Sequence, residues 1–258
     1  MRNFDAPSAY GLSPGVVMRS GLPEAISNGA MRMRNSCVCA LGLLLLSRPV
    51  AGQGSVVTVP VGAAPVIDGA IGVGEWDDAA NVPLHGGEGL YVKRSGQHLY
   101  VAIRGSAGGI GSVCLGDNTR VRVLHASTGL ITAEYYHAEN RWSLAHGFRG
   151  PRRGTGERFA RGDSGGEAYR AAQLEQFGWV ANLVEQGPGT DMEYQIDLTD
   201  VTDSAVYMSV AFLQARAQMR VARAPASLDD GSLDTELIAG GARDGLVFVP
   251  TSWLELHF

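Results

Sequence analysis

The sequence predicts an all-β protein, an antiparallel β-sandwich with a two-sheet architecture of the jelly-roll or immunoglobulin-like kind. From residue 56 onward, short apolar or alternating segments recur between clusters of Gly, Pro, Asn and Asp. Few stretches have the length and the spacing of apolar residues that a long helix needs. Short strands separated by turn signals are typical of β-sandwiches.

Three segments carry the period of two that places alternate side chains on one face of a sheet. They are residues 99–103, 120–123 and 206–213, in which apolar side chains alternate with their neighbours. The segments that suit short helices are residues 75–80 and part of residues 226–239, where Asp or Ser is available as a cap. No internal repeat and no second domain boundary is evident.

Two hairpins are expected in the second half of the chain. In the first, residues 130–137 pair with residues 141–146, and Asn140 in the connection is able to adopt a left-handed conformation. In the second, residues 178–185 pair with residues 192–198 across a cluster of Gly, Pro and Thr.

Composition and charge narrow the classes of function. The chain has 258 residues, with 21 basic and 26 acidic side chains and 45% hydrophobic residues. A net charge of -5 is small for this length and, with so many apolar residues, argues against intrinsic disorder. The acidic balance also argues against a protein built mainly to neutralise nucleic-acid phosphates.

The amino terminus has the pattern of a secretory signal peptide. A basic segment at residues 31–35 precedes the mostly apolar residues 37–46, and small residues follow as far as Gly52. About 20 apolar residues are needed to cross a bilayer, so this run is too short for a membrane span. We therefore expect export and cleavage near Gly52.

The leader defines the domain organisation. Residues 1–52 are predicted to be removed, with Met31 or Met33 as alternative starts of translation, and residues 53–258 to form one secreted or periplasmic domain. Cys114 is then the only cysteine of the mature chain. It lies in an apolar stretch, which favours a buried, inert thiol over a nucleophile.

Residues 147–168 stand apart because they hold five arginines among glycines and little apolar surface. A loop of this length is uncommon in a compact domain. It is either an arginine-lined flap for an anionic ligand or a solvated insertion, and the tolerance of surface loops for insertions favours the second interpretation.

A family resemblance rests on residues 65–79. Ile67-Asp68-Gly69, a short spacer and Glu75-Trp76 resemble the opening of family 9 carbohydrate-binding modules and their DOMON-like relatives. Residues 97–103, 116–123 and 191–198 are similar to later strands of these modules, in the expected order. The resemblance covers about residues 56–258 and implies an antiparallel β-sandwich in a secreted protein.

The opening motif also has a structural interpretation. Asp68 and Gly69 suit a tight turn in which the Asp68 carboxylate accepts backbone N–H groups. Trp76 brings a large apolar side chain that would close one end of the sandwich. Asp68 and Trp76 are therefore assigned to the architecture.

Motifs for metalloprotease and phosphate chemistry are missing from the predicted mature sequence, which has no His-Glu-x-x-His and no Gly-Lys-Ser/Thr. Glycoside hydrolysis needs two carboxylates that face each other across a cleft, and neighbours in sequence do not indicate this. We therefore expect the neighbouring acids to be solvated; they are Asp77, Asp78, Asp191, Glu193, Asp229 and Asp230.

The sequence gives partial support for two cofactors, haem and calcium. Some DOMON domains hold haem between a Met and a His, and Met192, Met208 or Met219 would be the candidates here. Asp117 and Asn118 offer hard oxygen ligands for a structural calcium ion, although calcium takes six to eight oxygens. An Asx turn that leads into a strand is the alternative for this pair.

Sugar binding calls for aromatic faces and planar polar groups. Trp142 and Trp179 fall on separate predicted strands and are candidates to flank a sugar ring, although either could be a core residue. The candidate hydrogen-bonding residues on an outward face are Tyr136, Arg104, Arg122 and Asn182.

These observations favour a secreted, non-catalytic protein similar to carbohydrate-binding modules, which binds glycan or polysaccharide chains alone or beside polysaccharide-degrading enzymes. The alternatives are a domain associated with glycoside hydrolysis, a haem or redox module of the DOMON type, and a purely structural domain.

Overall fold

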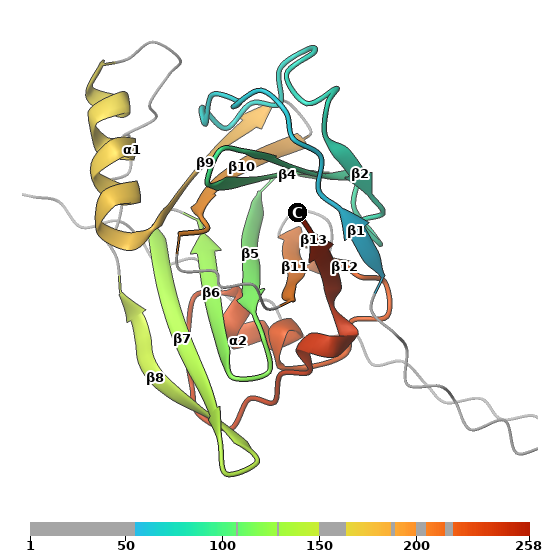
Figure 1. Cartoon of the computed structure of the whole chain (residues 1–258), viewed down its shortest axis with the longest axis vertical. Coiled ribbons are helices and arrows are strands. Elements are labelled where there is room, and N and C mark those ends of the chain that lie inside the picture. Colours follow the sequence, from blue (N-terminus) through green and yellow to red (C-terminus); the bar gives the residue numbers. More distant parts are fainter. Residues whose placement is uncertain are drawn as a thin grey trace, which may run out of the picture. The chain divides into compact units, whose positions relative to one another are not determined.

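The computed structural model describes residues 55–106, 108–127, 129–149, 164–186, 189–199, 205–214 and 219–258. The predicted leader, residues 1–52, lies outside these ranges. The described strands form two sheets packed face to face (Figure 1), so the predicted β-sandwich is confirmed. No helix in these ranges is both long and apolar enough to cross a membrane.

The larger sheet has eight strands within the described residues. They are β1 (Val56–Thr58), β13 (Leu254–His257), β11 (Val206–Gln214), β12 (Arg220–Ala224), β5 (Gly109–Gly116), β6 (Arg120–Ala126), β7 (Leu130–Ala138) and β8 (Arg141–Arg149). Their order is β1-β13-β11-β5-β6-β7-β8, and β12 pairs with the second half of β11. Neighbours are antiparallel except β1 and β13, which run parallel.

The smaller sheet has five strands within the described residues. They are β2 (Ala80–Val82), β3 (Gly89–Ser95), β4 (His98–Ser106), β10 (Gly189–Asp197) and β9 (Trp179–Gln186), in that order across the sheet. All its pairs are antiparallel. The register places Asp191 opposite Arg104, and it places Glu193 between Ala102 on β4 and Asn182 on β9.

The main hydrophobic core fills the space between the two sheets. It contains the alternating residues that the sequence placed on common faces: Leu99, Val101, Ile103, Val206, Met208, Val210 and Phe212. On β6, Val121 and Val123 point the other way, into a second core on the outer face of the larger sheet. The period of two therefore predicted which side chains share a face.

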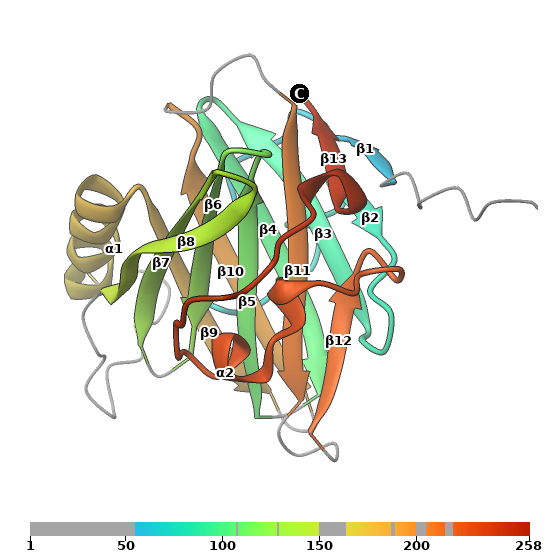
Figure 2. The same ribbon diagram turned by 90° about the horizontal axis from the view of Figure 1, so that it is seen from below.

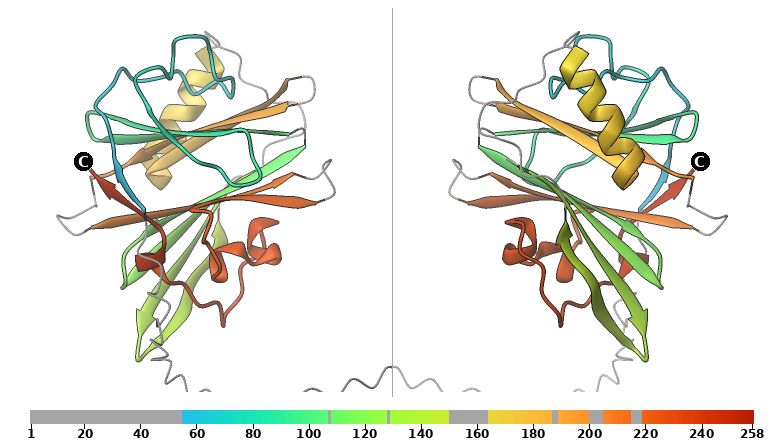
Figure 3. Two further views of the ribbon diagram at one scale, coloured as in Figure 1. Left: turned by 90° about the vertical axis from the view of Figure 1, so that its right-hand side faces the viewer. Right: turned by 90° about the vertical axis from the view of Figure 1, so that its left-hand side faces the viewer.

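Both sheets are covered on their outer faces as well (Figures 2 and 3). The carboxy-terminal segment crosses the larger sheet with η1 (Gly231–Leu233), α2 (Thr235–Ile238) and η2 (Pro250–Ser252). Trp253 and Phe248 of this segment form the second core with Tyr135 and Trp142 of the sheet. Cys114 is buried there too, and burial raises the pKa of its thiol to about 12, which confirms the prediction of a buried thiol.

The two predicted hairpins are confirmed with small changes of boundary. β7 and β8 are joined by only two residues, because Ala138 already pairs with Arg141. Glu139 and Asn140 have φ angles of 52° and 59°, as a two-residue type I′ turn requires. β9 and β10 form the second hairpin, and β10 begins earlier than expected, at Gly189.

The expected helices are partly wrong. Residues 73–78 form turns instead of a helix, whereas residues 226–239 do contain η1 and α2. The helix α1 (Ser164–Phe177), which packs beside β9, was not expected. The segment 147–168, which was expected to be one loop, begins within β8 and ends within α1. Residues 150–163 of this segment lie outside the described chain.

A close approach between Gly109 and Phe212, on neighbouring strands of the larger sheet, gives a first testable prediction. A Cβ atom added at Gly109 would overlap the ring of Phe212, which is fully buried. We expect Gly109→Ala to lower the free energy of unfolding by about 1 to 3 kcal/mol through overpacking. Gly147→Ala is the matched control, since a Cβ at Gly147 meets nothing within 4 Å. Equal midpoints of urea unfolding for the two variants would show that this contact does not restrict the core.

Candidate functional site

The opening motif lies on the outer face of the smaller sheet and not at the end of the sandwich, where Trp76 was expected. Trp76 is buried there with Ile67, Tyr100 and Ala102. Only 4% of Trp76 is exposed. Trp76 is thus a buried structural residue, as predicted, but it lies on the outer face of a sheet and not at the end of the sandwich.

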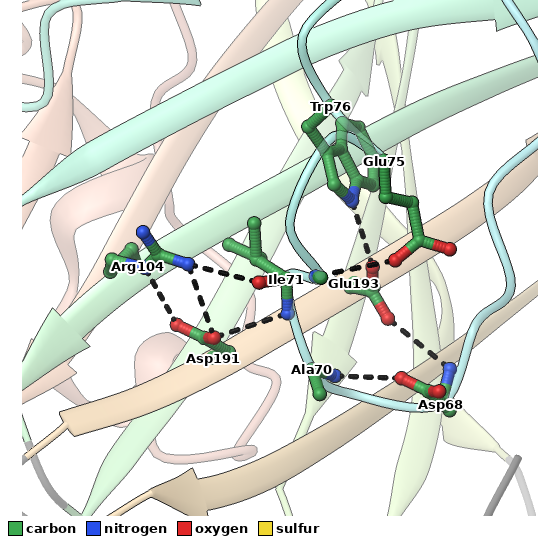
Figure 4. A network of polar contacts seen from close by, with 9 residues as sticks. Asp68, Ala70, Ile71, Glu75, Trp76, Arg104, Asp191 and Glu193 are labelled. Carbon is green, nitrogen blue, oxygen red and sulfur yellow. Dashed lines mark hydrogen bonds and ion pairs between the residues drawn. The ribbon is translucent and has the colours of Figure 1, made fainter.

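Glu193 ties this motif to the sheet (Figure 4). One carboxylate oxygen accepts a hydrogen bond from the indole Nε1 of Trp76 at 2.9 Å. The other accepts the backbone N–H groups of Gly69 at 2.9 Å and Asp68 at 3.2 Å. Asp68 itself accepts the N–H of Ala70 at 3.0 Å, which is the predicted Asx turn. A side chain 125 residues away therefore holds the turn in place.

Asp191 makes a parallel attachment two residues earlier. It accepts the backbone N–H of Ile71 at 3.1 Å and the Nε–H of Arg104 at 3.1 Å. Arg104 also donates to the Ile71 carbonyl at 3.2 Å. Arg104 is therefore engaged in fixing the motif, and its predicted role as a sugar contact remains untested. Asn182 lies opposite Glu193 on the outer face of the same sheet, as expected, but only 3% of it is exposed.

The expectation of solvated acids is wrong for several of the six. Asp191 is 6% exposed and Glu193 is 0% exposed, because residues 65–79 cover them. Burial raises the pKa of Glu193 to about 8, although the N–H groups of Trp76 and Gly69 oppose that change. Asp78 forms an ion pair with the fully buried Lys93, and Asp230 accepts hydrogen bonds from the backbone of Val249 and the indole of Trp253. These carboxylates hold loops in place.

Trp179 belongs to the main core and is not available to a sugar. It is 2% exposed, its ring stacks on Tyr194 at 6.0 Å between centroids, and its Nε1 donates to Thr132 Oγ1 at 2.7 Å. Trp142 belongs instead to the second core, on the other side of the larger sheet. The prediction that the two indoles flank one ring is therefore wrong, because they lie in different layers of the protein.

Tyr136 and Arg122 lie on the same face of β6 and β7, which is opposite to the face that holds Trp142. The guanidinium of Arg120 lies 5.7 Å from the centre of the Tyr136 ring, and Arg122 donates to the Phe177 carbonyl at 2.9 Å. Tyr136 is 43% exposed. Since alternate residues of a strand point to opposite faces, Tyr136 and Trp142 do not belong to one site.

A groove at the tip of the β7–β8 hairpin contains Trp142. It has a volume of about 350 Å³, within the range of small-molecule sites. The groove, called the hairpin groove below, is lined by Asn118, His137, Asn140, Arg141, Trp142 and residues 245–250. It thus joins a turn before β6, the hairpin turn and the carboxy-terminal segment.

Two stacked rings form one wall of the hairpin groove. The exposed imidazole of His137 stacks on Trp142, with 4.8 Å between the ring centroids and an angle of 28°. Trp142 is 7% exposed, and its Nε1 donates to the Phe248 carbonyl at 2.8 Å. The buried indole therefore supports the imidazole, which presents the aromatic surface of the groove.

A hydrogen bond selects the tautomer of His137. Its Nδ1 lies 3.1 Å from the carbonyl oxygen of Asn118. A carbonyl oxygen only accepts, so Nδ1 carries the proton, and Nε2 of the neutral ring is left as an acceptor. Asn140 and Arg141 add amide and guanidinium donors nearby. The hairpin groove thus combines a flat ring, an acceptor and planar donors.

Asp117 and Asn118 form a turn. One Asp117 oxygen accepts the backbone N–H groups of Thr119 at 2.6 Å and Arg120 at 2.9 Å, which is the Asx arrangement. The described residues contain no cluster of three or more His, Cys, Asp or Glu side chains suited to a metal. The alternative with an Asx turn is confirmed, and the calcium hypothesis stays a prediction.

The methionines proposed for haem lie apart from an open site. Met192 and Met208 are fully buried in the main core, and the sulfur of Met192 accepts a hydrogen bond from Tyr194 at 3.0 Å. Met219 is 62% exposed. A haem ligated by either core methionine would displace the packing between the sheets, so the structure gives this alternative no support.

The sequence-based prediction did not include His137, Asn140 and Arg141, which line the hairpin groove, among the candidate sugar contacts. Their signal was the hairpin itself, because a two-residue turn brings positions 137 and 142 opposite each other. Residues 245–250 gave no signal, since their position on the sheet depends on contacts distant in sequence.

Comparisons with known proteins concern the fold. The sequence matches no protein-family model and no curated protein. The chain is similar to a carbohydrate binding module family 9 from Caldicellulosiruptor kristjanssonii in complex with glucose, with a TM-score of 0.41 and 11% identity over 78% of this chain and 93% of that one. The same module in complex with cellotriose gives a TM-score of 0.38 and 11% identity over 78% and 91%.

Proposed function

We propose that the protein is a non-catalytic carbohydrate-binding protein and that the hairpin groove holds the glycan. The observation that carries this proposal is the imidazole of His137, which is stacked on Trp142 and exposed to the groove. A pyranose ring places C–H groups against such a face, while its hydroxyl groups need both donors and acceptors. Nε2 of His137 and the side chains of Asn140 and Arg141 supply them.

The charges of the hairpin groove support binding without hydrolysis. Within the described chain, its lining contains no Asp or Glu. Hydrolysis of a glycosidic bond by the usual route needs two carboxyl groups across the bond. The buried Glu193 is closed off by Gly69 and Trp76, so a substrate does not reach it in this arrangement.

Export is part of the same proposal and rests on the sequence of residues 31–52. A secreted or periplasmic protein that binds glycans would act on polysaccharide, alone or beside enzymes that degrade it. Mass spectrometry of exported material is expected to show an amino terminus near residue 53. Exported chains that keep Cys37 and Cys39 would contradict this part of the proposal.

A double variant tests the groove. Asn140→Gly with Arg141→Ala removes two polar side chains, and Gly suits the positive φ of residue 140, so the turn is kept. We expect affinity for the glycan to fall about tenfold or more if the site is a binding hot spot, with little change in melting temperature. Affinity electrophoresis in gels with cellulose derivatives, xylan, mannan or β-glucan identifies a glycan, and calorimetry measures its affinity.

The matched control is Tyr136→Ala. Tyr136 belongs to the same hairpin, is also exposed, and points to the opposite face. It should leave glycan affinity unchanged. A loss of binding in Tyr136→Ala, together with normal binding by the double variant, would move the site to the inner face of β6 and β7.

A further inference from the structure

A second hollow adjoins the hairpin groove. It has a volume of about 460 Å³ and is lined by Asp229, Asp230, Asp234, Arg243 and parts of η1. The two hollows share four residues of one strip of chain, namely Gly245, Leu246, Val247 and Val249. They are therefore neighbours on one surface, with this strip between them.

Hydrogen bonds with neighbouring parts of the protein hold the strip in place. The Val247 carbonyl accepts the N–H of Gly231 at 2.7 Å, and the N–H of Val249 donates to Asp230 at 2.8 Å. The Phe248 carbonyl accepts the indole N–H of Trp142 at 2.8 Å. These hydrogen bonds come from residues on both sides of the strip and fix the position of its backbone. A ligand that crosses the strip therefore needs no rearrangement of the backbone.

Two apolar side chains of the strip are exposed to solvent. Val247 is 64% exposed and Val249 is 43% exposed, whereas Leu246 and Phe248, which alternate with them along the chain, are buried in the second core. Isolated exposed apolar residues are ordinary. Here, however, both valines line both hollows, and they offer C–H surface where a chain of sugar rings would pass from one hollow to the other.

The charges of the two hollows differ, and they indicate whether the bound glycan chain is charged or uncharged. Arg141 is the only charged side chain that lines the hairpin groove within the described residues, with His137 counted as neutral. The second hollow has three carboxylates and one guanidinium, a net of two negative charges, and Arg243 is already paired with Asp234. A chain with a carboxylate or sulfate on each sugar would be repelled in the second hollow.

We infer that the two hollows form one binding surface for an uncharged glycan chain several sugars long, which crosses the Val247–Val249 strip. This inference rests on the proposed function and extends it from a single ring to a chain. His137 and Arg141 contact one part of the chain, and Asp229 and Arg243 contact another. Hydroxyl groups of a neutral sugar bind both carboxylate and guanidinium groups.

Affinity should therefore grow with the length of the oligosaccharide. A monosaccharide or disaccharide fills one hollow, while a longer chain gains the contacts of the second within the same molecule. We expect a hexasaccharide to bind at least about tenfold more tightly than the disaccharide of the same sugar, since a few additional contacts in a preformed site have this size of effect. Beyond the length that covers both hollows, affinity should level off.

Calorimetric titrations with the cello-, xylo- and manno-oligosaccharides of one to six sugars, and with oligogalacturonates, test this inference. The double variant Asp229→Ala with Arg243→Ala should lose the gain between disaccharide and hexasaccharide, whereas Asn140→Gly with Arg141→Ala should weaken binding at every length. Melting temperatures confirm that each variant is folded.

The outcomes separate the inference from the proposed function. Equal affinity for a disaccharide and a hexasaccharide would overturn the extended surface and leave the hairpin groove as a glycan site. Oligogalacturonates that bind as tightly as the neutral chains would overturn the assignment of an uncharged ligand. Failure of all these oligosaccharides and of the polysaccharide panel to bind would overturn the proposed function, and this inference with it.

Discussion

Replacing Trp179 with alanine is expected to lower the free energy of unfolding by about 3 to 5 kcal/mol, the cost of removing a large aromatic side chain from a core. Trp179 is 2% exposed in the core between the sheets. The change removes its packing on Tyr194 and leaves Thr132 without the indole N–H at 2.7 Å. Urea unfolding monitored by circular dichroism measures the effect.

Trp179→Phe is the control for this prediction. Phenylalanine keeps an aromatic ring in the core and loses the hydrogen bond and part of the volume, so its cost should be clearly smaller. A loss below about 1 kcal/mol in Trp179→Ala would be typical of a surface position and would contradict the burial of this residue. Trp142→Ala should also destabilise the protein, and in addition it should weaken glycan binding, because Trp142 supports His137.

The stability of the protein is expected to fall as the pH rises from about 6.5 to about 8, and Glu193 is the reason. Burial raises the pKa of Glu193 from 4.5 to about 8 in the folded protein. Between these values the folded chain binds a proton that the unfolded chain has released, so stability decreases with rising pH. The slope is at most about 1.4 kcal/mol for each pH unit.

His125 limits the window in which this effect is visible. Burial lowers its pKa from 6.5 to about 4, so the unfolded chain binds the additional proton between these values. Stability therefore rises with pH up to about 6.5 on account of His125, which opposes the effect of Glu193 in that range. Above pH 6.5 the effect of His125 on the slope declines, because the unfolded chain loses most of this remaining proton by about pH 7.5, and Glu193 then determines the sign of the slope.

Glu193→Gln separates charge from hydrogen bonding. The amide has nearly the shape of the carboxylate but does not titrate, so the fall in stability between pH 6.5 and 8 should disappear. At pH 6.5, where Glu193 is protonated in the folded chain, the variant should be less stable than the wild type by about 1 to 3 kcal/mol, because the amide nitrogen cannot accept an N–H group, whereas both oxygens of the acid can. Melting temperatures at half-unit steps of pH measure both effects. The same slope in variant and wild type would remove Glu193 as its origin.

The strands and the faces of the sheets were predictable from the sequence because their signals are local. Period-two alternation identified the residues of β4 and β11 that meet between the sheets. Asn140 between residues 137 and 141 marked a hairpin, although the turn itself has only two residues, Glu139 and Asn140. The helix α1 was missed because its apolar residues form no clear stripe, although Ser164 and Glu167 have the spacing of a capping box.

The covering of both sheets was not predictable, and this is why the site differs from the expected one. Whether an acid such as Glu193 is solvated depends on residues 65–79, which are far away in the sequence. The same holds for Trp142, which is buried under Phe248 of the carboxy-terminal segment. A single sequence shows that Trp142 and Trp179 are aromatic, but it does not show in which layer each of them lies.

Amide chemical shifts report most directly whether the glycan binds in the hairpin groove. Titration of ¹⁵N-labelled residues 53–258 with the oligosaccharide that binds most tightly should move the signals of His137, Asn140, Arg141 and Val247 most. Signals of the outer face of the smaller sheet, at Ile71 and Trp76, should stay in place. The largest shifts at Ile71 and Trp76, or beside Tyr136 and Arg122, would contradict the account.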